Sequence, residues 1–270
     1  MLAYVRLAYA FLYVPIALIV LFSFNSGRYA ADFRGFSLQW YGTALANPFV
    51  MDALKTSLII GFTSAVLATL FGTMAALGLQ VMRGWLRTLF DGLVYVAIMV
   101  PGIVIGIATL IALVALFDVL NPAIAGIWPE ALGVAPKLQL GLGSVIAAHT
   151  LFSLALVVLV VRARLAGMDR SLVEASMDLY ATPWATFRQI TLPQLVPAMV
   201  AGFLLAFTFS FDDFIVAFFV AGPNTTLPIY VFSSIRRGVT PEINAIGTMI
   251  LAISLLTMIV AQVLLRRRNG

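Results

Sequence analysis

The chain has 270 residues, of which 62% are hydrophobic and 10% are charged, and its mean hydropathy is +1.06. Soluble domains are about 45–50% apolar and about 25% charged, so this composition excludes a water-soluble globular fold and indicates a membrane protein. The formal net charge of +5 fits membrane topology better than nucleic-acid binding, because the positive side chains lie between apolar segments. The sequence contains no Cys and a single histidine, His149, which excludes disulfides, thiol chemistry and a site built from several histidines.

Six apolar stretches are long enough to cross a hydrocarbon core, which takes about 20 helical residues. Continuous apolar runs predict helices rather than the alternating strands of a barrel, because a backbone in lipid must satisfy its own hydrogen bonds. We therefore predict an all-α membrane protein with about six transmembrane helices in a single domain, residues 1–270. The spans are expected near residues 7–24, 58–79, 93–117, 143–161, 198–220 and 245–265, with Pro101 kinking or starting the third.

The first apolar stretch has two interpretations, a cleaved signal peptide or a retained helix. Phe22-Ser-Phe-Asn25 lacks a small-x-small cleavage pattern, which favours the retained helix. With both termini in the cytoplasm, the inside segments would hold ten of the 16 Lys and Arg residues, including the run Arg266–Arg268. This bias predicts a multi-pass protein with cytoplasmic termini.

A long segment between the fourth and fifth spans, residues 162–197, is expected on the cytoplasmic side. Ser171 and Glu174 have the spacing of a capping box, which predicts a helix from about Leu172 to Leu179. Thr182-Pro183 is a second start signal, because Thr is a good N-cap residue and Pro suits the first helical position. We expect a second short helix to reach about Ile190 and to be stopped by prolines 193 and 197, which leaves two short helices joined by a bend.

The 162–197 segment resembles the "EAA" loop of permease subunits of binding-protein-dependent ABC importers. That pattern is Glu-Ala-Ala, three residues, Gly, nine residues and Ile-x-Leu-Pro. The chain has Glu174-Ala-Ser176 and Ile190-Thr-Leu-Pro193 at matching spacing, with Tyr180 in the position of Gly. A residue other than Gly in a left-handed helix end costs about 1 kcal/mol, so Tyr180 predicts either a strained bend or a different exit from the helix.

This resemblance implies a type I ABC importer permease (MetI-like) fold, with the loop acting as the coupling helix that fits a groove on an ATPase subunit. Capping is an alternative role for Glu174. The residues that the resemblance places at the ATPase are Glu174, Ala175, Ser176, Asp178, Tyr180, Arg188, Ile190, Leu192 and Pro193.

The fifth predicted span contains two adjacent acids, Asp212 and Asp213, about 22 Å along a helix from Pro197. An acid at the centre of a transmembrane helix costs about 2.5–3.5 kcal/mol, so such a residue is expected to face a bundle interior or a water-filled path. Adjacent helical side chains point about 100° apart, so one acid would line the path while the other pairs with a loop or a neighbouring helix. Alternatively, both lie in headgroup water at the helix end. The predicted pathway residues are Phe211, Asp212, Asp213 and Phe214, and their charge favours a cationic solute.

The stretches 210–214, 220–228 and 238–245 resemble the permeases of polyamine (spermidine/putrescine) importers, and with the loop the resemblance covers about residues 162–245. It implies a bacterial inner-membrane protein that works with a second homologous permease, two ATPase subunits, a periplasmic solute-binding protein and membrane lipid. ATP and Mg would be bound by the ATPase, and this chain would bind no cofactor and no nucleic acid. Another amine or an amino-acid derivative is the alternative solute.

Residues 226–237 predict a short amphipathic helix on the outer face. Its Arg236 and Arg237 would meet either acidic groups of the binding protein or lipid headgroups. The Gly102-x-x-x-Gly106 pattern permits close helix packing, which we expect within this chain. His149 is expected to be a hydrogen-bonded structural residue rather than a proton relay.

The sequence has no phosphate-binding G-x-x-x-x-G-K-[ST] motif, because neither Lys55 nor Lys137 follows Gly. No nucleophile with a neighbouring base is evident, so the chain is not expected to be an enzyme. A stand-alone secondary carrier is the alternative class, and it would not need residues 171–193.

Overall fold

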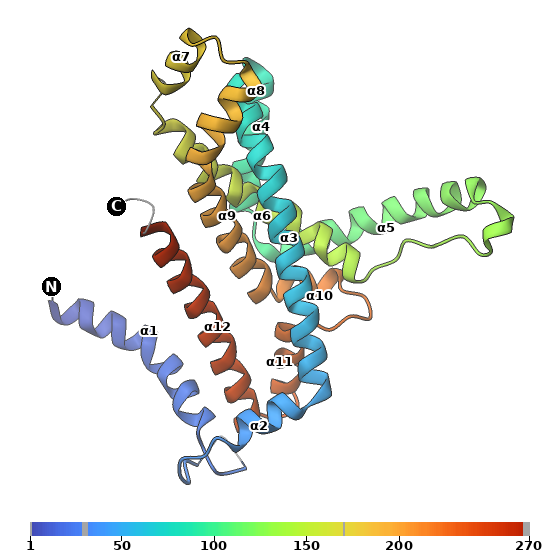
Figure 1. Cartoon of the computed structure of the whole chain (residues 1–270). Helices are drawn as coiled ribbons and strands as arrows, with labels where there is room; N and C mark the ends of the chain where they lie inside the picture. The colour runs from blue at the N-terminus through green and yellow to red at the C-terminus, as the bar shows by residue number, and fades with distance from the viewer. Residues whose placement is uncertain (1, 29–31, 170, 267–270) are drawn as a thin grey trace. The chain divides into compact units, whose positions relative to one another are not determined.

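The computed structural model describes residues 2–28, 32–169 and 171–266. Arg267 and Arg268, part of the predicted positive run, lie outside the described residues. Six helices in the described part of the chain are long and apolar enough to cross a membrane, which confirms the predicted all-α architecture (Figure 1). They are Tyr4–Ser23, Pro48–Val81, Gly102–Ile127, Leu142–Ala166, Pro183–Asp212 and Pro241–Ile259.

The helices form two compact units. The first unit, Met1–Ser57 with Thr225–Val260, contains α1 (Leu2–Ser23), α2 (Gln39–Ala46), the start of α3 (Pro48–Val81), α11 (Leu227–Ile235) and most of α12 (Pro241–Arg266). The second unit, Leu58–Asn224 with Ala261–Gly270, contains the rest of α3 and α4 (Trp85–Met99), α5 (Gly102–Ile127), α6 (Leu142–Ala166), α7 (Ser171–Asp178), α8 (Pro183–Thr186), η2 (Phe187–Thr191), α9 (Leu192–Asp212) and α10 (Ile215–Val220). A 3-10 turn, η1 (Glu130–Leu132), follows α5.

In the first unit, the turn after α1 is organised around the buried side chain of Asn25. Its Oδ1 accepts hydrogen bonds from the backbone amides of Gly27 and Arg34 at 3.1 and 2.9 Å, and its Nδ2 donates to the carbonyl of Asp32 at 2.8 Å. The indole of Trp40 donates to the Asn25 carbonyl. The loop between α1 and α2 is therefore held by its own polar groups.

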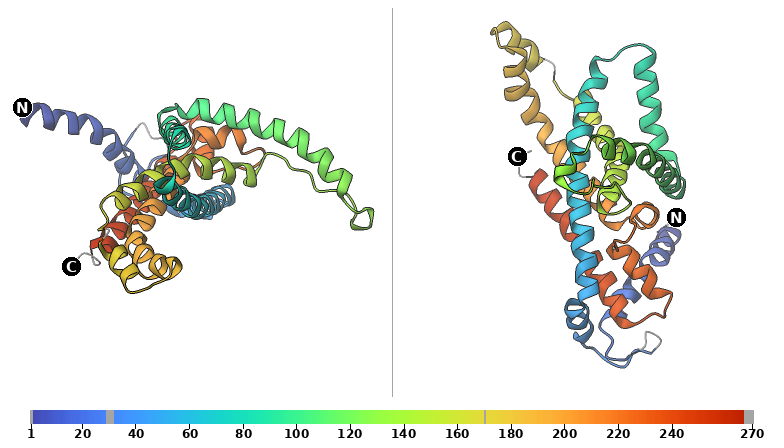
Figure 2. Two further views of the ribbon diagram at one scale, coloured as in Figure 1. Left: turned by 90° about the horizontal axis from the view of Figure 1, so that it is seen from above. Right: turned by 90° about the vertical axis from the view of Figure 1, so that its right-hand side faces the viewer.

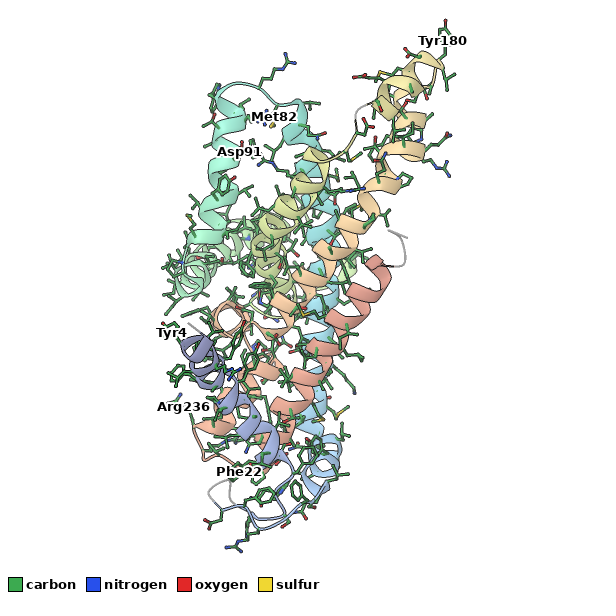
Figure 3. The ribbon with its side chains drawn as sticks, turned by 90° about the vertical axis from the view of Figure 1, so that its left-hand side faces the viewer. Tyr4, Phe22, Met82, Asp91, Tyr180 and Arg236 are labelled. Carbon is green, nitrogen blue, oxygen red and sulfur yellow. The ribbon has the colours of Figure 1, made fainter. Side chains whose placement is uncertain are left out.

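The same unit has a second polar junction where α2 meets α3. The side-chain amide of Asn47 donates to the Tyr230 hydroxyl on α11 and to the Glu242 carboxylate on α12, at 3.2 and 3.1 Å. By contrast, residues 4–21 of helix α1 contain no buried residue. Figure 3 shows Tyr4 and Phe22 near the two ends of this helix. An apolar helix this exposed is suited to lipid or to another membrane subunit.

The core of the second unit lies between α6, α9 and α3, and α6 runs beside α9 (Figures 1 and 2). Close approach is possible because Gly72 and Gly202 both face Val157. A Cβ on Gly72 would lie 2.8 Å from the Cβ of Val157. Similarly, a Cβ on Gly106 of α5 would lie 2.7 Å from the ring of Phe219 on α10, so the small-residue pattern packs within this chain, as predicted.

The predicted third span, residues 93–117, is wrong in its boundaries. The chain breaks at Val100 and Pro101, so that α4 ends at Met99 and α5 begins at Gly102. Proline lacks an amide hydrogen and forces the preceding residue out of the helical region, and Val100 is extended accordingly. Pro101 thus starts the third span, one of the two predicted roles, and α5 projects from the unit before residues 128–141 return to α6 (Figure 2).

The predicted fifth span, residues 198–220, is also divided. Helix α9 ends at Asp212, Asp213 is extended, and α10 starts at Ile215. The break is stable because the Asp213 carboxylate accepts the backbone amide hydrogen bond of Ala217 at 3.0 Å, which satisfies one of the free donors at the start of α10.

The start of the second helix in the 162–197 segment is confirmed, but its predicted end is wrong. Thr182 Oγ1 accepts the Ala185 amide at 3.3 Å, and Pro183 is the first helical residue. Helix α8 then continues through the π-helical turn η2 into α9, with Pro193 in the first turn of α9 and Pro197 inside it. Transmembrane helices tolerate prolines because local π-helical turns and neighbouring helices satisfy the freed backbone groups, and here η2 lies directly before the first turn of α9, so these prolines do not stop the helix.

Candidate functional site

Helix α7 begins differently from the predicted capping box. Ser171 is the first residue of α7, and its amide donates to the Oδ1 of Asp169 at 2.9 Å. The capping acceptor is therefore Asp169 rather than Ser171, whose side chain also hydrogen-bonds to Asp169. Hydrogen bonds from the backbone and then the side chain of Ser171 lower the pKa of the exposed Asp169 carboxyl below its ordinary value of 3.8.

Tyr180 ends α7 in the strained bend that was one of the two predicted outcomes. Its φ angle is +58°, and it is the one non-glycine with positive φ within the described ranges. The Tyr180 amide donates to the carbonyl of Met177 at 2.9 Å, and the Ala181 amide donates to that of Ser176 at 3.0 Å. This pair of bonds is a Schellman motif, which normally has glycine in the left-handed position.

Helices α7 and α8 are joined by a buried hydrogen bond between the hydroxyls of Ser176 and Thr186, at 2.8 Å. Ser176 therefore faces α8. Trp184 is exposed and stacks on Phe187, and Tyr180 stands at the tip of the pair, at the same end of the second unit as Met82 and Asp91 (Figure 3). Of the other predicted coupling residues, Glu174, Ala175, Asp178, Arg188 and Pro193 are exposed, and Ile190 and Leu192 are half-buried.

The two adjacent acids at the α9–α10 break point in different directions. Asp212 is exposed at the end of α9, whereas the side chain of Asp213 is 17% exposed and turns toward α6 and α10. Of the neighbouring aromatic residues, Phe211 is buried beside Gly61, and the Phe214 ring packs on Phe218 at 5.3 Å between centroids.

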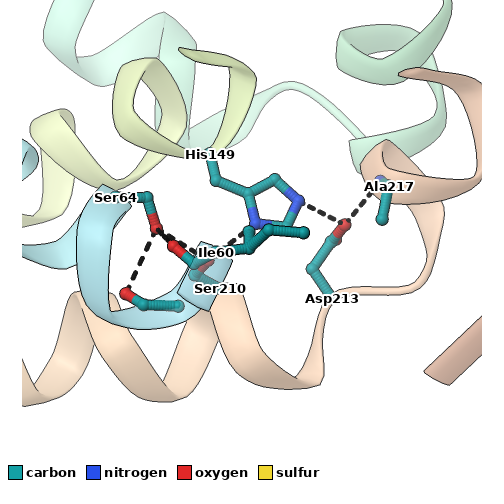
Figure 4. A network of polar contacts seen from close by, with 7 residues as sticks. Ile60, Ser64, His149, Ser210, Asp213 and Ala217 are labelled. Atoms are coloured by element: carbon teal, nitrogen blue, oxygen red, sulfur yellow. Dashed lines mark hydrogen bonds and ion pairs between the residues drawn. The ribbon is translucent and has the colours of Figure 1, made fainter. Parts of the chain in front are cut away.

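A buried polar network joins Asp213 to three helices of the second unit (Figure 4). His149 of α6 is 1% exposed, and its Nε2 lies 3.3 Å from Asp213 Oδ2. Its Nδ1 lies 2.7 Å from the hydroxyl of Ser210 on α9, which lies 2.8 Å from the hydroxyl of Ser64 on α3. His149 is thus hydrogen-bonded as predicted, but Ser64 and Ser210 were not singled out from the sequence, because isolated serines in apolar helices carry no local signal.

In the first unit, the predicted amphipathic helix is α11, and Arg236 and Arg237 follow it directly. Both arginines are exposed, and Arg237 donates to the hydroxyl of Ser234 at 3.3 Å. The two cations are therefore available to an external partner or to lipid headgroups.

The fold and these features define a multi-pass helical membrane protein of the transport-subunit class. Its second unit has an exposed pair of short helices, α7 and α8, and a helix break at two acids between α9 and α10. The family model described as "Binding-protein-dependent transport system inner membrane component" matches residues 68–269. The chain belongs to this family: it is a permease subunit of an ABC importer and not an enzyme.

Several curated relatives cover most of the chain. The putrescine transport system permease protein PotI of Escherichia coli (strain K12) is 40% identical over 248 residues, which are 91% of this chain and 83% of the relative. The spermidine/putrescine transport system permease proteins PotC of Escherichia coli (strain K12) and of Haemophilus influenzae are 36% and 35% identical, over 97% and 99% of this chain and 92% and 96% of theirs.

Solved structures with the same fold include a bacterial ABC transporter for import of the acidic polysaccharide alginate and the MetNI methionine ABC transporter. The first has a TM-score of 0.76 at 16% identity, covering all of this chain and 95% of the other. The second has a TM-score of 0.62 at 17% identity, covering 80% and 94%. These similarities confirm the MetI-like permease fold.

Proposed function

We propose that this subunit forms half of the translocation pathway for a polyamine, with putrescine and spermidine as the solutes. Relatives that are 35–40% identical along more than 90% of the chain carry these solutes in their names, which is the observation that supports the proposal most directly. A second homologous permease would form the other half of the path. Two ATPase subunits would bind ATP and Mg, and a periplasmic solute-binding protein would deliver the polyamine.

The pathway would be lined at the α9–α10 break by Asp212. Its carboxylate is exposed on the second unit, whereas the neighbouring Asp213 is turned inward to His149. A carboxylate in a path of low dielectric attracts a cation strongly, which suits an alkylammonium solute. Phe214 would provide an apolar surface beside it for the methylene groups of the polyamine.

The coupling surface would be the exposed side of α7 and α8. Glu174, Ala175 and Asp178 offer charge and a small contact surface, and the exposed Trp184 offers an apolar anchor. This surface would lie in the cytoplasm, with both chain termini on the same side. Arg236 and Arg237 would then face the periplasm and meet acidic groups of the binding protein.

Uptake by the reconstituted importer tests the solute and the role of Asp212 together. With the binding protein outside and ATP inside proteoliposomes, we expect saturable uptake of radiolabelled putrescine. Asp212→Asn should reduce it about tenfold, because loss of roughly 1.4 kcal/mol of cation binding changes a rate or affinity by that factor. Asp52→Asn, at an exposed acid of α3 paired with Lys55, is the matched control and should leave uptake unchanged.

Two results would contradict this proposal. Normal putrescine uptake by Asp212→Asn would remove Asp212 from the pathway. Transport of another amine or of an amino-acid derivative, with neither putrescine nor spermidine transported, would show that the solute class is wrong.

A further inference from the structure

The buried network around His149 has more close polar contacts than its side chains, in their uncharged forms, have hydrogens to donate. Ser64 Oγ lies 2.7 Å from the Ile60 carbonyl oxygen and 2.8 Å from Ser210 Oγ. Ser210 Oγ lies 2.7 Å from His149 Nδ1, and His149 Nε2 lies 3.3 Å from Asp213 Oδ2. Two hydroxyls and one neutral imidazole supply three hydrogens, but these contacts number four.

The direction of each hydrogen bond follows from the carbonyl end of the network. A carbonyl oxygen only accepts, so the Ser64 hydroxyl hydrogen is used by Ile60, or by Gly61 at 3.3 Å. The Ser64–Ser210 contact then needs the Ser210 hydrogen, and the Ser210–His149 contact needs a hydrogen on Nδ1. A neutral imidazole protonated at Nδ1 would aim the bare lone pair of Nε2 at the Asp213 carboxylate.

A contact between the unprotonated Nε2 and the Asp213 carboxylate would be unfavourable, because both groups can only accept a hydrogen bond. His149 Nε2 is buried and makes no hydrogen bond of normal geometry within the described residues, so Asp213 is the acceptor that its position offers. One additional proton on Nε2 satisfies the imidazole and turns a repulsive contact into an ion pair. The geometry places the proton on the imidazole, because Asp213 Oδ2 already accepts the Ala217 amide hydrogen, whereas the buried Nε2 has no other group to bond within the described residues.

Other titratable groups are also present on the helices that pack against α6. These are Asp52 and Lys55 near the start of α3, Arg87, Asp91 and Tyr95 on α4, Asp118 on α5, and Asp212 beside Asp213 on α9, while α10 has none. Asp91 is paired with Arg162, which is thirteen residues or roughly 20 Å from His149 along α6. Asp213 is the acid that the structure places against the imidazole.

We propose that His149 and Asp213 form a buried proton-binding site, in which an imidazolium–carboxylate pair holds the α9–α10 break in place. The pair is electrically neutral as a whole, which permits it to be buried in an apolar helical bundle. It connects α6 with the end of α9 and the first turn of α10, and Ser210 extends the connection to α3. His149 is thus a positioning residue that fixes the backbone carrying Asp212, and Asp213 contributes no net charge to the pathway.

The single histidine makes the proton directly observable, because the ring of the full chain gives one set of histidine nitrogen signals. We expect nitrogen-15 NMR of the histidine-labelled chain in lipid nanodiscs at neutral pH to show both ring nitrogens protonated. Asp213→Asn should remove the hydrogen from Nε2 and leave the one on Nδ1. Thr150→Ala, which removes a hydroxyl bonded to its own helix, is the control and should leave the spectrum unchanged. A neutral ring in the unmodified chain, in either tautomer, would overturn the proposal.

A stability measurement provides a second test that does not depend on the spectrum. His149→Gln leaves the partly buried carboxylate of Asp213 without its counter-charge and should lower the Tm of the chain in detergent by several degrees. Adding Asp213→Asn to His149→Gln removes the uncompensated charge, so the double variant should melt at a higher temperature than His149→Gln alone. A double variant that is no more stable than His149→Gln would show that the two charges do not compensate each other. Both tests are independent of which solute the importer carries.

Discussion

Tyr180 stands where the loop pattern has glycine, and its backbone keeps the conformation that glycine would adopt. Its φ angle of +58° places a Cβ in the left-handed region, and its side chain is 96% exposed, so no buried contact compensates the strain. The Schellman hydrogen bonds from Tyr180 and Ala181 fix the conformation. The aromatic ring stands at the tip of the pair, where a partner subunit would meet it.

Tyr180→Gly should therefore stabilise the end of α7. Removing the left-handed strain is worth about 1 kcal/mol, which slows local opening about fivefold. Hydrogen exchange of the Ala181 amide in the reconstituted full chain measures this. Tyr180→Ala is the matched control, because it removes the ring but retains a Cβ at positive φ. Equal slowing in both variants would show that the ring, rather than the backbone, is responsible.

At the scale of elements, the first turn of α7 is capped by the exposed carboxylate of Asp169. Asp169 accepts the Ser171 amide, and this hydrogen bond is what lowers the pKa of Asp169. A carboxyl whose pKa is lower in the folded state stabilises that state above its ordinary pKa of 3.8, and the contribution is lost as the pH falls through the lowered value.

The first turn of α7 should thus loosen in acid because of Asp169. The chain has no cysteine of its own, so a spin label attached at Leu172→Cys reports this turn alone. We expect label mobility to be constant from neutral pH down to about 4 and to rise below 3.8. Asp169→Asn retains an acceptor oxygen without a titratable charge, so its mobility should not change with pH. The same acid-induced rise in Asp169→Asn would rule out the carboxylate as its source.

The existence of these elements could be predicted from the sequence more reliably than their ends. Long apolar runs identified six spans, because lipid forces each run to form its own hydrogen bonds. The break at Asp213 was missed because residues 214–220 continue the apolar run, and what stabilises the break is a side-chain bond to Ala217 that hydropathy does not register. The prolines at 193 and 197 do not end the helix as predicted, because a transmembrane helix tolerates prolines in its interior and a π-helical turn precedes Pro193.

Of the candidate sites, those built from a local sequence motif could be predicted, and those built from distant residues could not. The 162–197 segment was recognisable because its motif is local and its spacing is fixed. The pairing of His149 with Ser210 joins residues 61 positions apart, and only the packing of α6 on α9 brings them together. The two acids were expected to diverge as neighbours on one helix, but they diverge because α9 ends at Asp212 and Asp213 is extended. The His149 partner of Asp213 could not be predicted from the sequence.

At the scale of the whole molecule, one continuous helix connects the proposed coupling surface to the proposed pathway acid. Pro183–Asp212 runs for 30 residues through α8, η2 and α9, with the exposed Trp184 near its start and Asp212 at its end. A helix of this length spans about 45 Å and transmits displacement as long as it stays rigid. Movement of α8 by an ATPase would therefore displace the α9–α10 break and the network that anchors it.

A flexible joint in this helix should separate ATP hydrolysis from transport. Gln189→Gly combined with Thr191→Gly weakens η2 by about 1 kcal/mol at each position and leaves Glu174, Arg188 and the rest of the proposed contact surface unchanged. We expect the ATPase subunits to co-purify normally, ATP hydrolysis to persist, and putrescine taken up per ATP to fall about tenfold. Leu132→Gly combined with Val134→Gly, at exposed positions in the connection after α5, is the control and should preserve coupling. Loss of co-purification would instead place η2 in the ATPase interface. Unchanged coupling would mean that the movement of the coupling surface reaches the pathway through another element. The remaining connection between the coupling surface and the pathway is through α7 and the end of α6.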